Sequence, residues 1–291
     1  MSRLIKKEHK IEWIAGAITL VVALLLIGAV VWVMSGLTLP EDNSPTTAAP
    51  TVGTQPTTQP PQSPIKLNPY GPGDFEYENG YLTCVAGKST LGIDVSEFQG
   101  KIDWQTVAQT DVEFAIIRLG FRAWGSKGEI TADAYGLENL QGAREAGLKV
   151  GVYFFSQAIT VEEAREEARF VLQLLDGQAL DMPIVFDWET VPDPEARTAN
   201  ITPEKLNACI LAFCQEIRQG GYEPMVYFNP DLAVRMLDLR LLQSYGFRFW
   251  LAMYTDIMLF PYQVDMWQYS CGGTVKGITG SVDLNLLFTY E

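Results

Sequence analysis

The sequence predicts an α/β protein whose main domain is an irregular (β/α) TIM-like barrel of about eight strands. Three observations support this. From residue 91 onward, short apolar runs alternate with helical segments, an alternation that builds a parallel sheet. About eight such runs fall in roughly 200 residues, which is enough to close a barrel. The last third has too few residues between strands for full helices, so we expect irregularity there.

The N-terminal region predicts a membrane anchor. Residues 1–10 are short and basic, and residues 11–33 are nearly all apolar. As a helix, the apolar segment would be roughly 35 Å long, enough to span a bilayer. A cleaved signal peptide is the competing interpretation, but its apolar region normally runs only about 7–15 residues. We therefore expect a single-pass anchor, with residues 1–10 as a cytoplasmic tail and the rest outside.

A linker and a lead-in segment are expected between this anchor and the main domain. Residues 34–64 form the linker, because residues 40–64 alone contain seven prolines and six threonines and show no apolar periodicity. Residues 65–90 form the lead-in. Its Asn79-Gly80 turn signal predicts a small hairpin that pairs Phe75 and Tyr77 with Tyr81 and Leu82.

Residues 91–291 form the predicted barrel domain. Its expected strands are 91–95, 114–119, 149–155, 183–189, 224–228, 249–254, 264–269 and 282–288. Its expected helices are 103–109, 132–146, 161–175, 202–219 and 231–242. The helix at 202 has the clearest start, because Thr202 suits the N-cap and Pro203 the first helical position.

Composition limits the chemistry. The net charge of −14 disfavours nucleic acid as a partner, because phosphate binding needs a basic surface. The only histidine is His9, so the main domain cannot use Ser-His-Asp, Cys-His or His-ligated zinc chemistry. The four cysteines contain no C-x-x-C and make no metal site. A Cys84–Cys271 bond and four buried free thiols both remain open.

Two acids at the end of the 183–189 strand are the strongest candidate site. Asp187 and Glu189 are two residues apart, so on a strand their side chains project to the same face, with Cα atoms about 6.5 Å apart. Apolar surroundings raise the pKa of one carboxyl while its neighbour stays ionised, which separates acid and base roles. The alternative is a solvated pair or a helix cap. Asp94 and Tyr254 also end predicted strands, where barrel active sites lie.

Several motifs occur in a fixed order along the main domain. They are Gly92-Ile93-Asp94-Val95-Ser96, Asp187-Trp188-Glu189, Trp267-Gln268-Tyr269 and Val282-Asp283-Leu284-Asn285. With these motifs, residues 90–290 resemble the family 25 glycoside hydrolases, the N-acetylmuramidases also called Chalaropsis-type lysozymes. Asp-x-Glu alone is a weak signal, but the ordered set is specific.

The resemblance implies roles for individual residues. Glu189 would be the general acid/base, and Asp187 the nucleophile or the support of an oxazolinium intermediate. Asp94 and Asp283 would line the site. Candidate sugar-binding aromatics are Tyr153, Tyr227, Tyr254 and Trp267. Many members carry Tyr-His-Phe where this chain has Tyr153-Phe154-Phe155, a departure that would alter a site contact or subsite polarity.

Together with the predicted anchor at residues 11–33, the resemblance implies an extracellular enzyme that is held at the membrane and faces the cell wall. It would hydrolyse the β-1,4 bond between N-acetylmuramic acid and N-acetylglucosamine in peptidoglycan, with retention of configuration and without metal or cofactor. Its partners would be glycan strands and the cytoplasmic membrane. Two alternatives remain: a non-catalytic glycan-binding barrel and a chitinase-like hydrolase.

Overall fold

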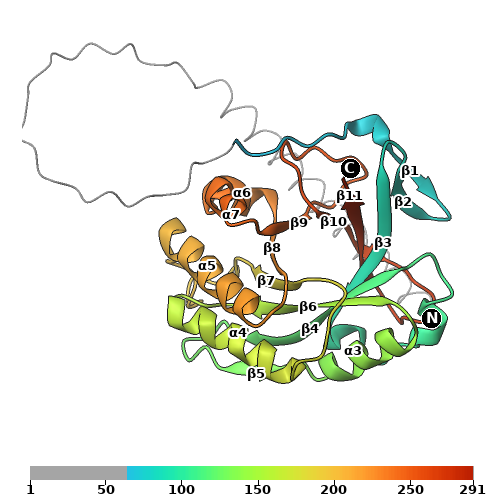
Figure 1. Cartoon of the computed structure of the whole chain (residues 1–291). Coiled ribbons are helices and arrows are strands. Elements are labelled where there is room, and N and C mark those ends of the chain that lie inside the picture. The colour runs from blue at the N-terminus through green and yellow to red at the C-terminus, as the bar shows by residue number, and fades with distance from the viewer. Residues whose placement is uncertain (1–63, 291) are drawn as a thin grey trace, which may run out of the picture. The chain divides into compact units, whose positions relative to one another are not determined.

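The computed structural model describes residues 64–290, which form an α/β domain built on a closed eight-stranded mixed barrel (Figure 1). Its strands are β3 (Lys88–Val95), β4 (Phe114–Arg122), β6 (Lys149–Ser156), β7 (Ile184–Trp188), β8 (Pro224–Phe228), β9 (Arg248–Ala252), β10 (Met266–Gly273) and β11 (Val282–Thr289). They pair in the order β3-β11-β10-β9-β8-β7-β6-β4, and pairing of β4 with β3 closes the ring.

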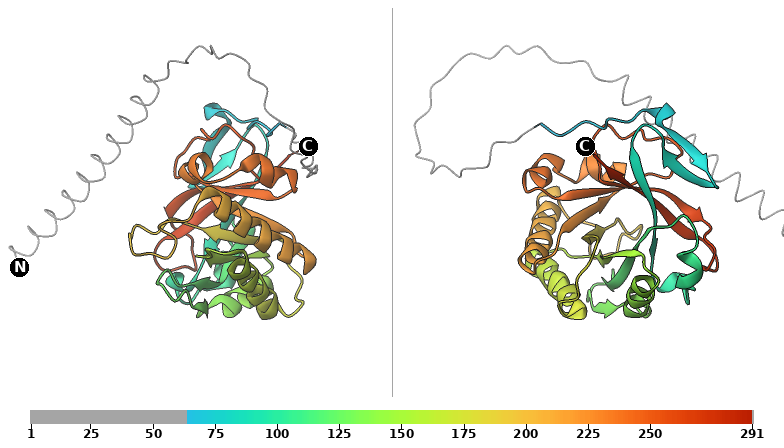
Figure 2. Two further views of the ribbon diagram at one scale, coloured as in Figure 1. Left: turned by 90° about the vertical axis from the view of Figure 1, so that its left-hand side faces the viewer. Right: turned by 45° about the vertical axis from the view of Figure 1, so that its right-hand side comes forward.

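Helices cover part of the outside of this ring. They are α2 (Trp104–Val107), α3 (Gly136–Glu145), α4 (Val161–Leu175), α5 (Pro203–Gln219), α6 (Pro230–Arg235) and α7 (Leu239–Ser244). Helices α4 and α5 pack side by side (Figure 2). The predicted start of α5 is confirmed, since the Thr202 hydroxyl accepts a hydrogen bond from the Lys205 amide and Pro203 occupies the first turn.

The parallel sheet expected from the sequence is corrected at β11, which runs antiparallel to both of its neighbours, β10 and β3. Only residues 274–281 connect β10 to β11. A parallel pair needs a crossover of a dozen or more residues, so this short connection forces the chain to reverse. As a result, the start of β11 lies at the same end of the barrel as the C-terminal ends of the parallel strands.

Two expected helices are also corrected. The helix expected at 132–146 begins at Gly136, because Ile130–Ala132 instead form strand β5 along the second half of β4. The helix expected at 231–242 divides into α6 and α7. The break is stabilised by the Asp238 carboxylate, which accepts from the Leu241 amide and caps the second helix.

Side-chain alternation along the strands produces two apolar cores. Inside the barrel, Ile116, Val185, Met225, Trp250 and Met266 pack together. Outside it, side chains of the opposite parity pack against the helices. One such contact joins Phe186 to Phe213 of α5, with ring centroids 5.0 Å apart.

The expected hairpin is confirmed as β1 (Phe75–Glu78) and β2 (Tyr81–Cys84), which pair antiparallel. Its turn residues Asn79 and Gly80 both have positive φ, as a tight hairpin turn requires. Ahead of it, the Lys66 carbonyl accepts from the Gln263 amide, and Leu67 bridges to Tyr262, just before β10 begins.

The cysteines are all free thiols. Cys84, Cys209 and Cys214 are buried, whereas Cys271 is exposed on β10. The Cys84–Cys271 bond is therefore absent from the structure, and the alternative of four buried thiols is wrong for Cys271.

The tail (1–10), the anchor (11–33) and nearly all of the linker (34–64) lie outside the described residues, so these remain predictions. Within residues 64–290, no helix combines the length and apolar character needed to cross a membrane.

Trp267, which we expected to contact sugar, is part of the outer core. Its side chain has no solvent exposure and packs edge-on against Phe75 of the hairpin, with centroids 5.2 Å apart. Its indole N–H donates to the Met253 carbonyl at 2.7 Å. The expectation is wrong because the neighbouring residues Met266 and Gln268, not Trp267, have the parity that faces the barrel interior.

Trp267→Ala should therefore destabilise the fold by roughly 3–5 kcal/mol, because it leaves a large cavity beneath the hairpin. Urea unfolding of the domain measures this effect. Trp124→Ala is the matched control: Trp124 is half exposed, and its truncation should change stability by only about 0.5 kcal/mol. Equal effects of the two substitutions would contradict the structural role of Trp267.

Candidate active site

Four carboxyl groups meet at one end of the barrel, which we call the mouth. Asp94 and Asp283 are direct cross-strand partners on β3 and β11. Asp187 lies near the end of β7, and Glu189 immediately follows that strand. The mouth thus combines the C-terminal ends of parallel strands with the start of the one antiparallel strand in this ring.

The predicted pairing of Asp187 with Glu189 corresponds to the geometry. Asp187 is only 5% exposed. Burial raises the pKa of Asp187 well above its usual range, and the charges of Glu189 and Asp94 raise it further. Burial and the charge of Asp283 also raise the pKa of Glu189. The two carboxyls are close enough to share a hydrogen bond when one is protonated.

Asp94 is held by two carboxamides. Its Oδ2 accepts hydrogen bonds from Gln268 Nε2 and Asn285 Nδ2, each at 2.8 Å. These bonds lower the pKa of Asp94, but burial and the adjacent Asp283 outweigh them and raise it overall. Four carboxyls with raised pKa values in one buried region cannot all be ionised cheaply, so the mouth favours retention of a proton.

Aromatic donors orient those carboxamides. The hydroxyls of Tyr227 and Tyr254 both donate to Gln268 Oε1, at 2.8 and 3.1 Å. The indole N–H of Trp250 donates to Asn285 Oδ1 at 2.8 Å. Because each carboxamide oxygen is already occupied, each NH₂ group must point at Asp94.

Arg118 supplies positive charge near the acids. Its charge lowers the pKa of both Asp187 and Tyr153, against the larger effect of burial. Arg118 Nε donates to Asp133 at 2.7 Å, and Nη2 donates to Glu97 at 3.0 Å. The guanidinium is thus already paired and acts on Asp187 through space.

A hydrogen bond from Gln157 holds the main chain at Glu189. Gln157 is fully buried, and its Nε2 donates to the Glu189 carbonyl at 3.0 Å. Thr198 Oγ1 donates to Gln157 Oε1 at 2.9 Å, and Arg197 Nη1 donates to the Gln157 carbonyl at 3.1 Å. The β6–α4 connection therefore holds both Glu189 and the segment that follows β7.

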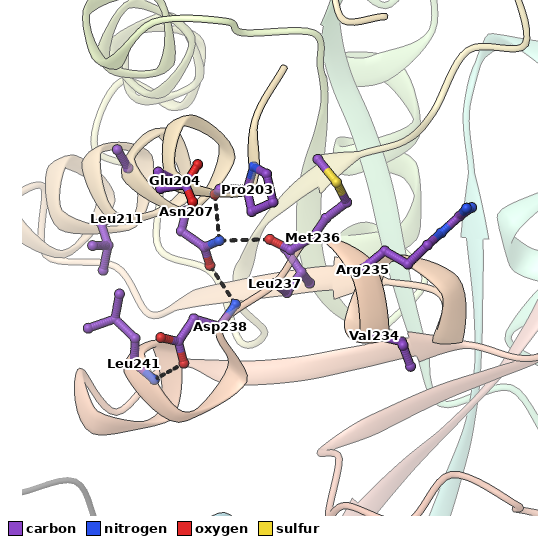
Figure 3. Close-up of a pocket in the computed structure, with 11 residues that line it drawn as sticks. Pro203, Glu204, Asn207, Leu211, Val234, Arg235, Met236, Leu237, Asp238 and Leu241 are labelled. Atoms are coloured by element: carbon purple, nitrogen blue, oxygen red, sulfur yellow. Dashed lines mark hydrogen bonds between the residues drawn. The ribbon is translucent and has the colours of Figure 1, made fainter. Parts of the chain in front are cut away.

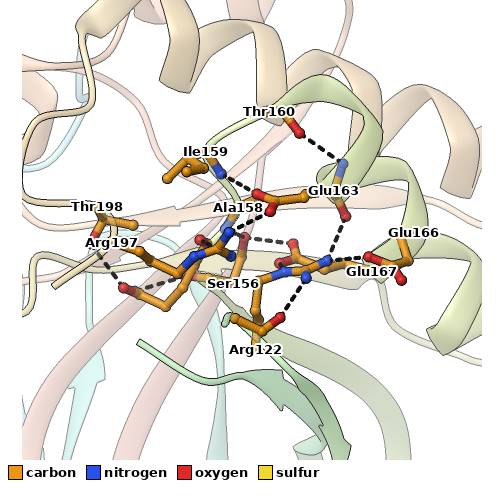
Figure 4. A network of polar contacts seen from close by, with 12 residues as sticks. Arg122, Ser156, Ala158, Ile159, Thr160, Glu163, Glu166, Glu167, Arg197 and Thr198 are labelled. Atoms are coloured by element: carbon orange, nitrogen blue, oxygen red, sulfur yellow. Dashed lines mark hydrogen bonds and ion pairs between the residues drawn. The ribbon is translucent and has the colours of Figure 1, made fainter. Parts of the chain in front are cut away.

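This support extends to α4 (Figure 4). Arg197 is paired with Glu163 near the start of that helix. Arg122 Nε donates to Glu167 at 2.6 Å, and Ser156 Oγ donates to the same carboxyl at 2.6 Å. Burial raises the pKa of Glu167 to about 7, although both hydrogen bonds act in the opposite sense.

Three of the four predicted aromatics belong to the mouth. Tyr153 and Tyr227 pack around Trp250 inside the barrel, and Tyr254 is 53% exposed beside them. Phe154, at the position of the expected departure from Tyr-His-Phe, points outward and packs against Phe170. The phenylalanine at position 154 therefore does not face the carboxyls, and the expected change of a site contact at this position is wrong.

Sequence reasoning missed the residues that hold the acids in place, namely Gln268, Asn285, Arg118 and Gln157. Three of them carried a usable signal: Gln268, Asn285 and Arg118 have the strand parity of inward-facing residues. Gln157 carried none, because it acts from a connection outside the strands.

A separate surface cavity of about 440 Å³ lies between α5 and the α6–α7 corner (Figure 3). Asn207 lines it and is fully hydrogen-bonded there: its Nδ2 donates to the Pro203 and Met236 carbonyls, and its Oδ1 accepts from the Asp238 amide. The polar groups of Asn207 thus serve the fold, and the lining contains none of the four mouth carboxyls.

Within the described residues, no three His, Cys, Asp or Glu side chains are arranged to hold a metal ion.

Comparison with known proteins gives the family. The model for glycosyl hydrolases family 25 matches residues 93–278, which include Asp94, Asp187 and Glu189. This chain belongs to glycosyl hydrolase family 25.

Two curated relatives and one solved structure illustrate the similarity of this family 25 domain. YegX of Escherichia coli O157:H7, described as uncharacterized, is 30% identical over 213 residues, covering 67% of this chain and 68% of that protein. The autolytic lysozyme of Clostridium acetobutylicum is 26% identical, covering 67% of this chain and 54% of that protein.

The solved structure is the modular autolysin LytC from Streptococcus pneumoniae, in complex with a synthetic peptidoglycan ligand. It aligns with a TM-score of 0.62 and 24% identity, covering 74% of this chain and 52% of LytC. This chain therefore spans about half the length of LytC, and the likeness shows a shared fold.

The electrostatic coupling across the mouth can be tested directly. Asp283→Asn removes a negative charge that raises the pKa of Glu189, so the pKa of Glu189 should fall. Carboxyl-carbon NMR titration of the domain would measure this shift. Asp111→Asn, just before β4 at the opposite end of the barrel, is the control and should leave the pKa of Glu189 unchanged. An unchanged or raised pKa in Asp283→Asn would refute the coupling.

Proposed function

We propose that this family 25 domain is a peptidoglycan hydrolase of the lysozyme type, which cleaves the β-1,4 bond between N-acetylmuramic acid and N-acetylglucosamine. The observation that carries the proposal is the contact between Asp187 and Glu189 in a buried mouth that raises the pKa of both. The autolytic lysozyme relative and the peptidoglycan ligand of LytC support the choice of substrate.

Glu189 is assigned as the general acid. The raised pKa of Glu189 widens the pH range over which it holds a proton, and protonated Glu189 can transfer that proton to the leaving glycosidic oxygen. Once ionised, the same carboxylate removes a proton from the incoming water. Gln157 keeps the Glu189 main chain in place during both steps, through its hydrogen bond to the carbonyl.

Asp187 is assigned to the positive charge that develops at the anomeric carbon. Its Oδ1 is buried and receives no hydrogen bond from residues 64–290. The other oxygen, Oδ2, is the one that would meet substrate, either by attack on the anomeric carbon or by accepting a hydrogen bond from the substrate's acetamido N–H. Both routes retain configuration, and the close approach of the two carboxyls favours retention because inversion needs room for water between them.

The alternatives predict different products. A chitinase-like enzyme would use the same acids on N-acetylglucosamine polymers. A non-catalytic glycan-binding barrel would not need a carboxyl pair with raised pKa values, so the geometry argues against it.

Glu189→Gln should lower the rate of peptidoglycan hydrolysis by about 10²–10⁴-fold, because it removes the proton donor while preserving shape. The assay analyses the sugar at the new reducing ends of fragments released from peptidoglycan, with a chitin oligomer tested in parallel. Muramic acid ends support the proposal, and glucosamine ends point to the chitinase-like alternative. Glu195→Gln, an exposed glutamate in the following loop, should retain activity.

We also propose that the predicted anchor at residues 11–33 holds the domain at the outer face of the cytoplasmic membrane, on the basis of its apolar length and the basic residues before it. The full chain should then sediment with membranes and remain there after a high-salt wash, whereas a chain that begins at Ile65 should be soluble. Release of the full chain by salt would contradict an integral anchor.

A further inference from the structure

Phe98 is an exposed aromatic residue at the mouth that has no role in the proposed mechanism. It lies four residues after Asp94, in the short 3₁₀ turn η2 (Glu97–Gln99), and its side chain is 81% exposed. Among the large apolar side chains exposed in residues 64–290, it is the only phenylalanine. Exposure of such a ring has no benefit for the fold, and the turn that carries it begins three residues after the mouth carboxyl Asp94.

The turn that carries Phe98 is hydrogen-bonded to the rest of the barrel on two sides. On one side, Gln99 Nε2 donates at 3.2 Å to the carbonyl of Ser281, two residues before Asp283. On the other side, the Glu97 amide donates at 3.0 Å to Asp133 Oδ2. The turn is therefore tied to the residue just before β11 and, through Asp133, to the segment between β5 and α3.

Arg118 supports the ring from the barrel side. Its guanidinium carbon lies 5.0 Å from the centroid of Phe98 and 5.2 Å from that of Phe121. Arg118 itself is only 7% exposed and is held by Glu97 and Asp133. One face of the Phe98 ring thus rests on a buried cation, and most of the rest of the ring is open to solvent.

We propose that the exposed face of Phe98 is a stacking platform for a pyranose ring of the substrate, in a subsite beyond the scissile bond on the β3–β4 side of the mouth. The inference rests on the proposed function. The apolar C–H face of a pyranose matches a flat aromatic surface, and the contact of the Phe98 ring with Arg118 leaves its other face free for such a sugar. Trp124, half exposed after β4, lies on the same side, whereas Tyr254 lies on the β9 side. A glycan strand would therefore cross the mouth over the carboxyls, from Tyr254 toward Phe98.

The competing explanation is that Phe98 only shields Arg118. The two differ in what they predict for substrates of different length. A shield affects stability and acts equally on all substrates, whereas a subsite outside the scissile bond matters only for glycans long enough to reach it.

The test compares Phe98→Leu and Phe98→Trp with wild type on soluble glycan strands freed of stem peptides, using long strands and the shortest cleaved oligomer. Phe98→Leu should raise KM for long strands about five- to tenfold with little change in kcat, and leave the short oligomer nearly unaffected. Phe98→Trp should keep KM near the wild-type value. Leu67→Ala, which removes a 70% exposed side chain near the start of β10, is the control and should change neither constant.

Binding provides a second readout that does not need turnover. In a Glu189→Gln background, Phe98→Leu should weaken calorimetric affinity for the long strands by the same factor. If wild type cleaves the strands but Phe98→Leu behaves like Leu67→Ala, the platform is wrong while the enzyme assignment stands. If wild type releases no fragments, the proposed function itself fails. Should Phe98→Leu unfold, Phe98→Gln takes its place with the same expected outcomes, because it also removes the aromatic surface.

Discussion

Repulsion among four carboxyl groups in a poorly solvated space is the constraint on which the mouth of this barrel depends. Two carboxamides donate to Asp94, and the charge of Arg118 acts on Asp187. Tyr227, Tyr254 and Trp250 then hold those carboxamides in one orientation. Most of the aromatic and amide side chains around the mouth can be understood as parts of this arrangement, which keeps the acids buried without unfolding the barrel.

Much of the fold could be predicted because strand and helix periodicities are local properties of the sequence. The eight barrel strands and the start of α5 at Thr202 were readable in this way. The direction of β11 was not read correctly, although the shortness of 274–281 implied it. Strand β5 and the break between α6 and α7 depend on tertiary contacts and single caps, such as Asp238, that override local preference.

The acids of the site were predictable for the same local reason. A spacing of two on a strand brings Asp187 and Glu189 to one face. The same rule assigns Trp267 outward and Gln268 inward. The wrong expectation that Trp267 contacts sugar came from giving its residue type more weight than its position along the strand. Gln157 could not have been found, because its hydrogen bond to the Glu189 carbonyl depends on the packing of two connections distant in sequence.

Lys66 and Leu67 contact the segment just before β10, and these contacts show where the chain enters the domain. The parallel strand β10 begins at the end of the barrel opposite the mouth, so the chain enters the domain there. A strand such as β7 or β6 spans roughly 17–26 Å. The point at which the chain enters the domain therefore lies about one strand length away from the four carboxyls of the mouth.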